Sequence, residues 1–190
     1  DDGADCQRTQ SILAAAYDLL EEEGLDGLTI RAMLKRTGLA RRAFYERFEG
    51  KDDLVVAVFA ATLKEAATHF DQETAKLDSP LEQLRHIVYG LVHGSQADTS
   101  ITIGMRRVSA IVREHMRLAQ TRPAGLEAAL APLLRVIADR ISAGIRTGQM
   151  RESDPALQAT LIYNLIAGTA HSELLMEESG EAGPYRRKRL

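Results

Sequence analysis

The sequence predicts an all-α protein, on three observations. Ala and Leu dominate the apolar residues, aromatic residues make up only 5% of the chain, and runs of β-branched residues are scarce, a composition that favours helices. Apolar residues recur three and four positions apart along much of the chain. All prolines except Pro132 lie near predicted helix starts or joins. A chain of 190 residues is expected to form one or two domains.

The first predicted helix covers about residues 9–23. Its apolar side chains follow the spacing of one helix face and are Ile12, Ala15, Ala16, Leu19 and Leu20. Gly24 follows directly, and a glycine in the left-handed conformation commonly ends a helix.

Two short helices are predicted next, joined by a tight turn at Gly38. Thr29 suits the N-cap of the first of them, because its hydroxyl can accept a backbone N–H. The second covers about residues 41–48, with Phe44 and Phe48 on its inner side. Its outer side then carries Arg41, Arg42 and Tyr45. Two short helices around a glycine turn are typical of a helix-turn-helix, which places its second helix in the major groove of DNA.

The distribution of charge supports this interpretation. Residues 31–51 hold seven basic and two acidic side chains, a net charge of +5. The whole chain carries −3, so the remaining residues sum to −8. Positive charge is therefore concentrated where a polyanion would bind.

Longer helices are predicted after residue 52. They cover about residues 53–76, a segment opened by Ser79-Pro80, a segment from Ile101 to Val112, and a segment that follows Pro123 and ends at Gly148. Pro132 is expected either in the first turn of that last segment or at a kink, because a proline deeper in a helix costs ~3 kcal/mol. Asp154-Pro155 predicts a further helix start, with an N-cap followed by proline at the first helical position.

The helix after Pro155 is apolar on more than one side. Leu157, Leu161, Leu165 and Gly168 form one stripe, and Ile162, Ile166 and Thr169 form another. A helix exposed on one side does not need both stripes, so one of them is expected to contact a second subunit. The alternative is a helix buried fully within one subunit. The residues predicted at a dimer interface are Leu161, Ile162, Leu165, Ile166, Gly168 and Thr169.

Residues 9–54 resemble the DNA-binding domain of the TetR family of bacterial regulators. That family typically has a Thr that opens its second helix, an Ala-Gly-Val-Ser turn, a Tyr-x-x-Phe helix end, and a Lys with an acid that opens the fourth helix. Those places hold Thr29, the Thr37–Ala40 turn, Tyr45 with Phe48, and Lys51 with Asp52 and Asp53. The resemblance implies an N-terminal helix-turn-helix domain, residues 9–51, and a C-terminal helical bundle for effector binding and dimerisation, residues 52–190.

The predicted DNA contacts divide by type. By resemblance, Thr29, Tyr45 and Lys51 are expected to contact phosphates. Arg41 and Arg42 are the expected base readers, because an Arg fork fits guanine. Arg31 and Arg47 are expected to flank the DNA backbone.

Two positions depart from the family pattern. Ala40 stands where Ser would cap the recognition helix, at a cost of ~0.5–2 kcal/mol. Ala43 stands where Thr would bond a phosphate, and the arginines can offset both losses through charge-assisted bonds.

An effector pocket in the C-terminal helices is a further implication of the resemblance. His86, Tyr89 and His93 share a helix face that can supply polar contacts in an apolar cavity, or can simply face solvent. The residues expected to line the pocket are Phe59, Leu63, Phe70, His86, Tyr89, His93, Met105 and Ile111.

Other classes of site have little support in the sequence. The histidines include no pair spaced as metal ligands on a helix, so no metal and no cofactor is expected. No Gly-rich phosphate loop or nucleophile elbow occurs. No apolar run reaches the length of a membrane span and no leader resembles a signal peptide. With one cysteine, Cys6, the cytoplasm is the expected location. Both ends look trimmed, and a helix beyond Leu190 is a possible missing element.

We therefore expect a homodimeric, ligand-responsive regulator, a repressor by family habit, that binds palindromic operator DNA and is released by a small molecule. It is not expected to be an enzyme. One alternative is a helical-bundle enzyme or small-molecule binding protein whose basic N-terminal helices serve another partner. A second is a protein–protein adaptor that uses the helix after Pro155.

Overall fold

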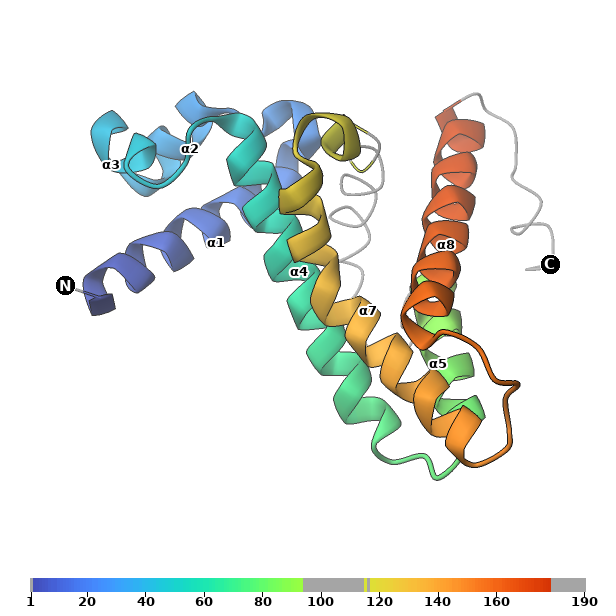
Figure 1. Ribbon diagram of the computed structural model, residues 1–190. Helices are drawn as coiled ribbons and strands as arrows, with labels where there is room; N and C mark the ends of the chain where they lie inside the picture. Colours follow the sequence, from blue (N-terminus) through green and yellow to red (C-terminus); the bar gives the residue numbers. More distant parts are fainter. Residues whose placement is uncertain (1, 94–114, 116, 179–190) are drawn as a thin grey trace. The chain divides into compact units, whose positions relative to one another are not determined.

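The computed structural model describes residues 2–93, 115 and 117–178. All regular structure in these residues is helical, as predicted (Figure 1). The helices are α1 (Asp2–Gly27), α2 (Ile30–Thr37), α3 (Arg41–Tyr45), α4 (Lys51–Thr74), α5 (Pro80–His93), α7 (Pro123–Arg146) and α8 (Pro155–Glu178). The predicted segment from Ile101 to Val112 lies outside the described residues.

The chain forms two compact units. The first consists of Asp1–Thr62 with Thr102–Ala129, and the second of Leu63–Ile101 with Leu130–Leu190. Helices α4 and α7 each contribute residues to both units. These units are defined by packing, so the functional division into residues 9–51 and 52–190 stays a prediction.

In the first unit, α1, α2 and α3 surround one apolar core. Helix α1 packs against α2, and Gly24 adopts a φ of 70°, where the predicted end of the first helix lies. The helix begins seven residues earlier than predicted, because apolar periodicity marks only the packed part of a helix. The fully buried side chains of this core include Ile12, Leu20, Leu28, Met33, Phe44, Leu54 and Phe59.

Helix α3 is shorter than the predicted 41–48. The N–H of Arg47 donates to the carbonyl of Phe44 over 3.0 Å, a three-residue spacing that tightens the chain into a turn. Ala40 offers no side-chain bond to the first turn. A short helix gains few backbone hydrogen bonds, and without an N-cap bond its ends are not stabilised, so it stays short.

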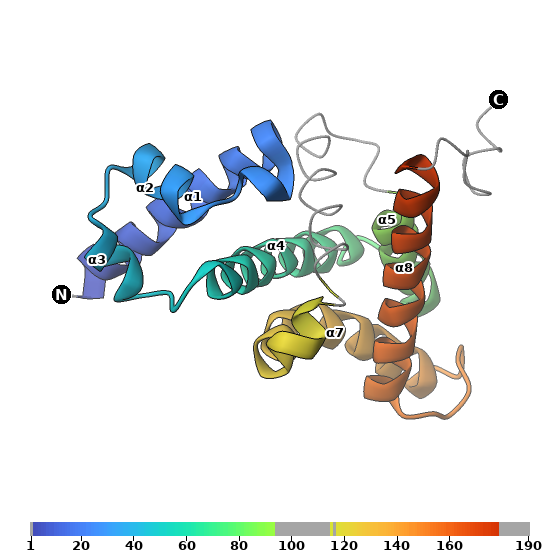
Figure 2. The same cartoon turned by 90° about the horizontal axis from the view of Figure 1, so that it is seen from above.

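In the second unit, α5 packs against α8, and the two run side by side in both views (Figures 1 and 2). Helix α8 begins after Asp154, whose Oδ1 accepts the N–H of Ala156 over 2.9 Å, so the predicted N-cap is confirmed. Pro132 lies well inside α7, not in its first turn. The most buried side chains of this unit include Thr74, Ile87, Leu133, Ile137 and Ala159.

Candidate nucleic-acid interface

The turn between α2 and α3 is fixed at both ends by local chemistry. The Thr29 hydroxyl accepts the N–H of Ala32 over 3.1 Å, which caps α2. Gly38 has a φ of 68°, and its N–H donates to the carbonyl of Leu34 over 3.0 Å. A side chain at that φ would be strained, so glycine is required here. The predicted cap and turn are both confirmed.

Two buried rings orient α3. Phe44 is fully buried and Phe48 nearly so, with ring centroids 5.4 Å apart. Because both rings point into the core, the opposite side of this short helix faces solvent. Tyr45 is 43% exposed there, and Arg41 and Arg42 are exposed beside it. We refer to these three residues as the α3 face.

Within the α3 face, Arg41 and Tyr45 are arranged together. The Arg41 guanidinium carbon lies 5.5 Å from the centre of the Tyr45 ring, a cation–π geometry. The Tyr45 ring also meets Phe44 edge-on, with centroids 5.5 Å apart. The buried ring therefore supports the exposed one, and the exposed ring supports the guanidinium.

Not every basic residue of the 31–51 window is available to a ligand. Arg36 binds both oxygens of Glu22, so it ties α2 to α1. This pairing lowers the pKa of the Glu22 carboxyl and raises that of Arg36. Arg42 contacts Glu46 over 3.1 Å, yet its side chain is 91% exposed. An exposed pair of this kind is worth little, so a phosphate or base can displace Glu46.

The other predicted DNA contacts differ in exposure, and both Arg47 and Lys51 are half-buried. Arg31 is exposed on α2, and Thr29 is exposed at its N-cap. Arg47 donates from Nη1 to the carbonyl of Ala43 over 2.9 Å. Lys51, the first residue of α4, donates from Nζ to the carbonyl of Leu25 over 3.2 Å, which places its ammonium against the end of α1. Since an ammonium has three donors, the bond to Leu25 leaves others for a ligand.

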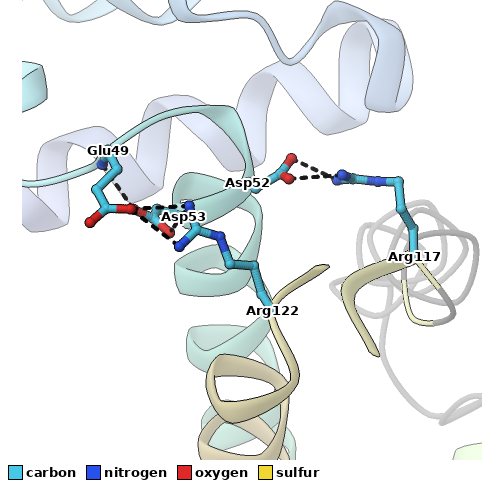
Figure 3. Close-up of polar contacts among 5 residues, drawn as sticks. All are labelled: Glu49, Asp52, Asp53, Arg117 and Arg122. Atoms are coloured by element: carbon cyan, nitrogen blue, oxygen red, sulfur yellow. Dashed lines mark hydrogen bonds and ion pairs between the residues drawn. The ribbon is translucent and has the colours of Figure 1, made fainter. Parts of the chain in front are cut away.

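Carboxylates flank Lys51, and two arginines from far along the chain bind them (Figure 3). Arg117 pairs with Asp52 through two bonds, of 2.9 and 2.8 Å. Arg122 contacts Glu49 and Asp53, each over 3.2 Å. The bond from Arg117 holds the pKa of Asp52 below its usual value. The sequence analysis missed both arginines, because no local spacing connects residues 65 and 73 positions apart.

The residues predicted to line an effector pocket have mixed environments. Phe59, Leu63 and Phe70 are buried along α4. His86 and Tyr89 are exposed on α5, which agrees with the solvent-facing alternative. Met105 and Ile111 lie outside the described residues, as does the side chain of His93. Ile87, on the same helix, is fully buried.

The residues predicted at a dimer interface divide into two groups on α8. Ile166 is buried, and Ile162 and Thr169 are half-buried. Leu161, Leu165 and Gly168 are exposed, together with Leu157. We refer to Leu157, Leu161 and Leu165 as the α8 leucine face.

Neither a metal site nor a membrane span is found in the part of the chain that the structure describes. No cluster of three potential metal ligands occurs among those residues. None of their helices combines the length and the apolar character that crossing a bilayer requires.

Comparisons with known proteins assign the N-terminal region. Residues 12–58 match the family of bacterial regulatory proteins named tetR. A curated relative, the tetracycline repressor protein class A from transposon 1721 of Escherichia coli, is 42% identical over 59 residues. That alignment covers 31% of this chain and 27% of the repressor, so the matched part is about a quarter of that relative.

Similarity to solved structures extends over most of the chain. FadR of Thermus thermophilus, a TetR-family repressor in complex with lauroyl-CoA, has a TM-score of 0.69 at 19% identity, covering 87% of this chain and 82% of FadR. RolR in complex with resorcinol has a TM-score of 0.68 at 20% identity, covering 92% and 82%. FadR of Bacillus subtilis in complex with stearoyl-CoA has a TM-score of 0.59 at 16% identity, covering 89% and 88%.

At these identities the structural similarity shows the fold. The N-terminal match adds the helix-turn-helix, whose turn and recognition helix have the geometry described above. The N-terminal region thus matches the tetR family of bacterial regulatory proteins, and over most of its length the chain has the fold of TetR-family regulators.

Proposed function

We propose that this protein is a ligand-responsive transcriptional repressor that binds palindromic operator DNA as a homodimer and is released by a small-molecule effector. The observation that carries the proposal is the α3 face: a guanidinium stacked on an exposed phenol ring beside a second arginine. Arg forks bind guanine edges, and phenol hydroxyls bind phosphate oxygens. Residues 9–51 serve as the DNA-binding domain and residues 52–190 as the effector-binding and dimerisation domain, in the cytoplasm.

The proposed contacts rest on the resemblance to the TetR pattern and on the exposure of the α3 face. Arg41 and Arg42 read bases, because they lie on the exposed side of α3. Tyr45, Lys51 and Thr29 bind phosphates, and Arg31 and Arg47 flank the backbone.

Homodimerisation is supported by the α8 leucine face. Leu157, Leu161 and Leu165 are 55%, 53% and 73% exposed, in a row along one helix. A continuous apolar surface of this kind favours burial against a copy of itself. A two-fold dimer also suits a palindromic site, whose half-sites lie ~34 Å apart.

Release by an effector requires a ligand that favours a different spacing of the two recognition helices. Operator affinity then falls by the ratio of the ligand's affinities for the two states. The complexes of structural neighbours with lauroyl-CoA and resorcinol support a small-molecule effector.

The test is selection of bound duplexes from a random pool, followed by binding at several salt concentrations. We expect a palindromic consensus and a steep decrease of affinity with salt, because phosphate contacts release counterions. Failure to retain any duplex at low salt would contradict the proposal and favour the alternative, a helical-bundle enzyme or small-molecule binding protein. A compound that binds tightly without changing operator affinity would contradict the release mechanism.

A further inference from the structure

The turn between α3 and α4 combines charges that oppose each other in DNA binding. Lys51 is proposed to bind a phosphate, but Glu49, Asp52 and Asp53 lie within two positions of it. An uncompensated carboxylate beside a phosphate repels it. The turn needs cations of its own to approach DNA.

Arg117 and Arg122 supply these cations (Figure 3). The fork of Arg117 meets both oxygens of Asp52, at 2.9 and 2.8 Å. The fork of Arg122 bridges Glu49 and Asp53. The Asp53 carboxylate also accepts the backbone N–H of Glu49 over 2.8 Å, and this bond joins the two ends of the turn. We refer to these five residues as the arginine clamp.

The arginine clamp is separate from the core that folds the helix-turn-helix. Phe44 and Leu54 are fully buried, whereas the side chains of Arg117, Asp52 and Arg122 are 40%, 34% and 37% exposed. Partly exposed ion pairs add little to the stability of a domain. Bidentate pairs do restrict geometry, however, because each fork accepts only one orientation of a carboxylate.

We infer that Arg117 and Arg122 are positioning residues for DNA binding, which hold the turn of residues 49–53 so that Lys51 and the α3 face reach DNA together. The inference rests on the proposed function, because it presumes that this surface binds a duplex. Neither arginine is required to touch the nucleic acid.

Three variants test the inference: Arg117→Gln, Asp52→Asn and the double variant. Affinity is measured for a duplex recovered by selection with the unaltered chain. We expect each single variant to bind about 3- to 10-fold more weakly, and the double variant to bind no more weakly than either, because the pair acts as a unit. Asp52→Asn is decisive, since loss of a negative charge would by itself tighten binding to DNA.

A charge-swapped pair, Asp52→Arg with Arg117→Asp, should recover most of the lost affinity, since it restores the ion pair in the opposite orientation. Arg85→Gln is the matched control. Arg85 pairs with Glu82 on α5 over 3.1 Å, so this variant removes the same charge from an exposed ion pair and should bind DNA normally. Thermal unfolding of each variant checks that the fold persists at the temperature of the binding assay.

Equal affinity of Arg117→Gln and the unaltered chain would overturn the inference. Weaker binding by Arg117→Gln with unchanged or tighter binding by Asp52→Asn would also overturn it, and would indicate direct contact of Arg117 with DNA. If the unaltered chain recovers no duplex at all, the proposed function fails instead.

Discussion

Helices α3 and α8 both leave large side chains in solvent, but of opposite chemistry. The α3 face presents two guanidinium groups and a phenol, supported from below by Phe44. The α8 leucine face presents three isobutyl groups. Ionic contacts to a polyanion weaken as salt rises, whereas burial of apolar surface does not. The two faces are therefore suited to different partners, and a change in salt concentration should affect DNA binding far more than association through α8.

The largest expected effect comes from the ring beneath the α3 face. Phe44→Ala removes a fully buried side chain from the three-helix core and should lower the free energy of unfolding by about 3–5 kcal/mol. Chemical denaturation followed by circular dichroism measures the change. Tyr45→Ala is the control, because Tyr45 is exposed and should change stability far less. Equal losses in the two variants would contradict the orientation of α3.

Next in size is a charge placed on the α8 leucine face. Leu165→Glu should prevent association of two copies and lower operator affinity by about 100-fold, because a dimer gains from binding two half-sites at once. Light scattering reports the oligomeric state, and fluorescence anisotropy the affinity. Leu81→Glu is a matched control, since Leu81 is also exposed but lies on α5. A Leu165→Glu variant that remains dimeric would refute the role of this face.

A smaller effect separates reading of bases from binding of the backbone within the α3 face. Arg42→Ala should cost about 1–3 kcal/mol on the selected operator and much less on random duplex. Tyr45→Ala should weaken both duplexes by the same factor, because phosphates carry no sequence information. Competition binding with the two duplexes measures the difference. Equal loss on both for Arg42→Ala would argue against base reading.

The N-cap of α2 gives a prediction of about 1 kcal/mol. Thr29→Ala removes the bond from the Ala32 N–H to the hydroxyl and should lower stability by about 0.5–2 kcal/mol. Thr29→Ser keeps the hydroxyl and serves as the control, measured by denaturation. If Thr29 also binds a phosphate, the Thr29→Ala variant will bind DNA more weakly and the Thr29→Ser variant will not. Full stability of the Ala variant would contradict the capping role.

The smallest effect concerns pH. Burial lowers the pKa of His115 from its usual value of 6.5, and its ring lies 6.3 Å from that of Phe59. The unfolded chain therefore binds a proton more readily, so the stability contributed by neutral His115 is complete above about pH 6.5 and is lost as pH falls below it. The unfolding midpoint should fall less in His115→Asn than in the unaltered chain between about pH 7.5 and about pH 5.5. Identical pH profiles would exclude His115 as a contributor.

Several features of the candidate site were predictable from the sequence because their causes are local. A glycine was needed at position 38, where φ is 68°. Thr29 was recognisable as a cap, since the bond spans only three residues. The spacing of Phe44 and Phe48 fixed the buried side of α3 and so left Arg41 and Tyr45 outside. Helix ends were less predictable. Helix α3 stops at Tyr45, and the bond from the Arg47 N–H to the Phe44 carbonyl that follows spans three residues instead of four.

The sequence by itself thus determined the helical class, the helix-turn-helix and the polarity of its recognition helix, because turn chemistry and side-chain periodicity act within a few residues. Only the tertiary structure decided which basic side chains remain available to bind DNA and which apolar stripe of α8 stays exposed to solvent. Arg36 is engaged by Glu22 on another helix, and Arg117 reaches Asp52 from 65 positions away. Such pairings depend on where distant helices pack, and no local pattern records that.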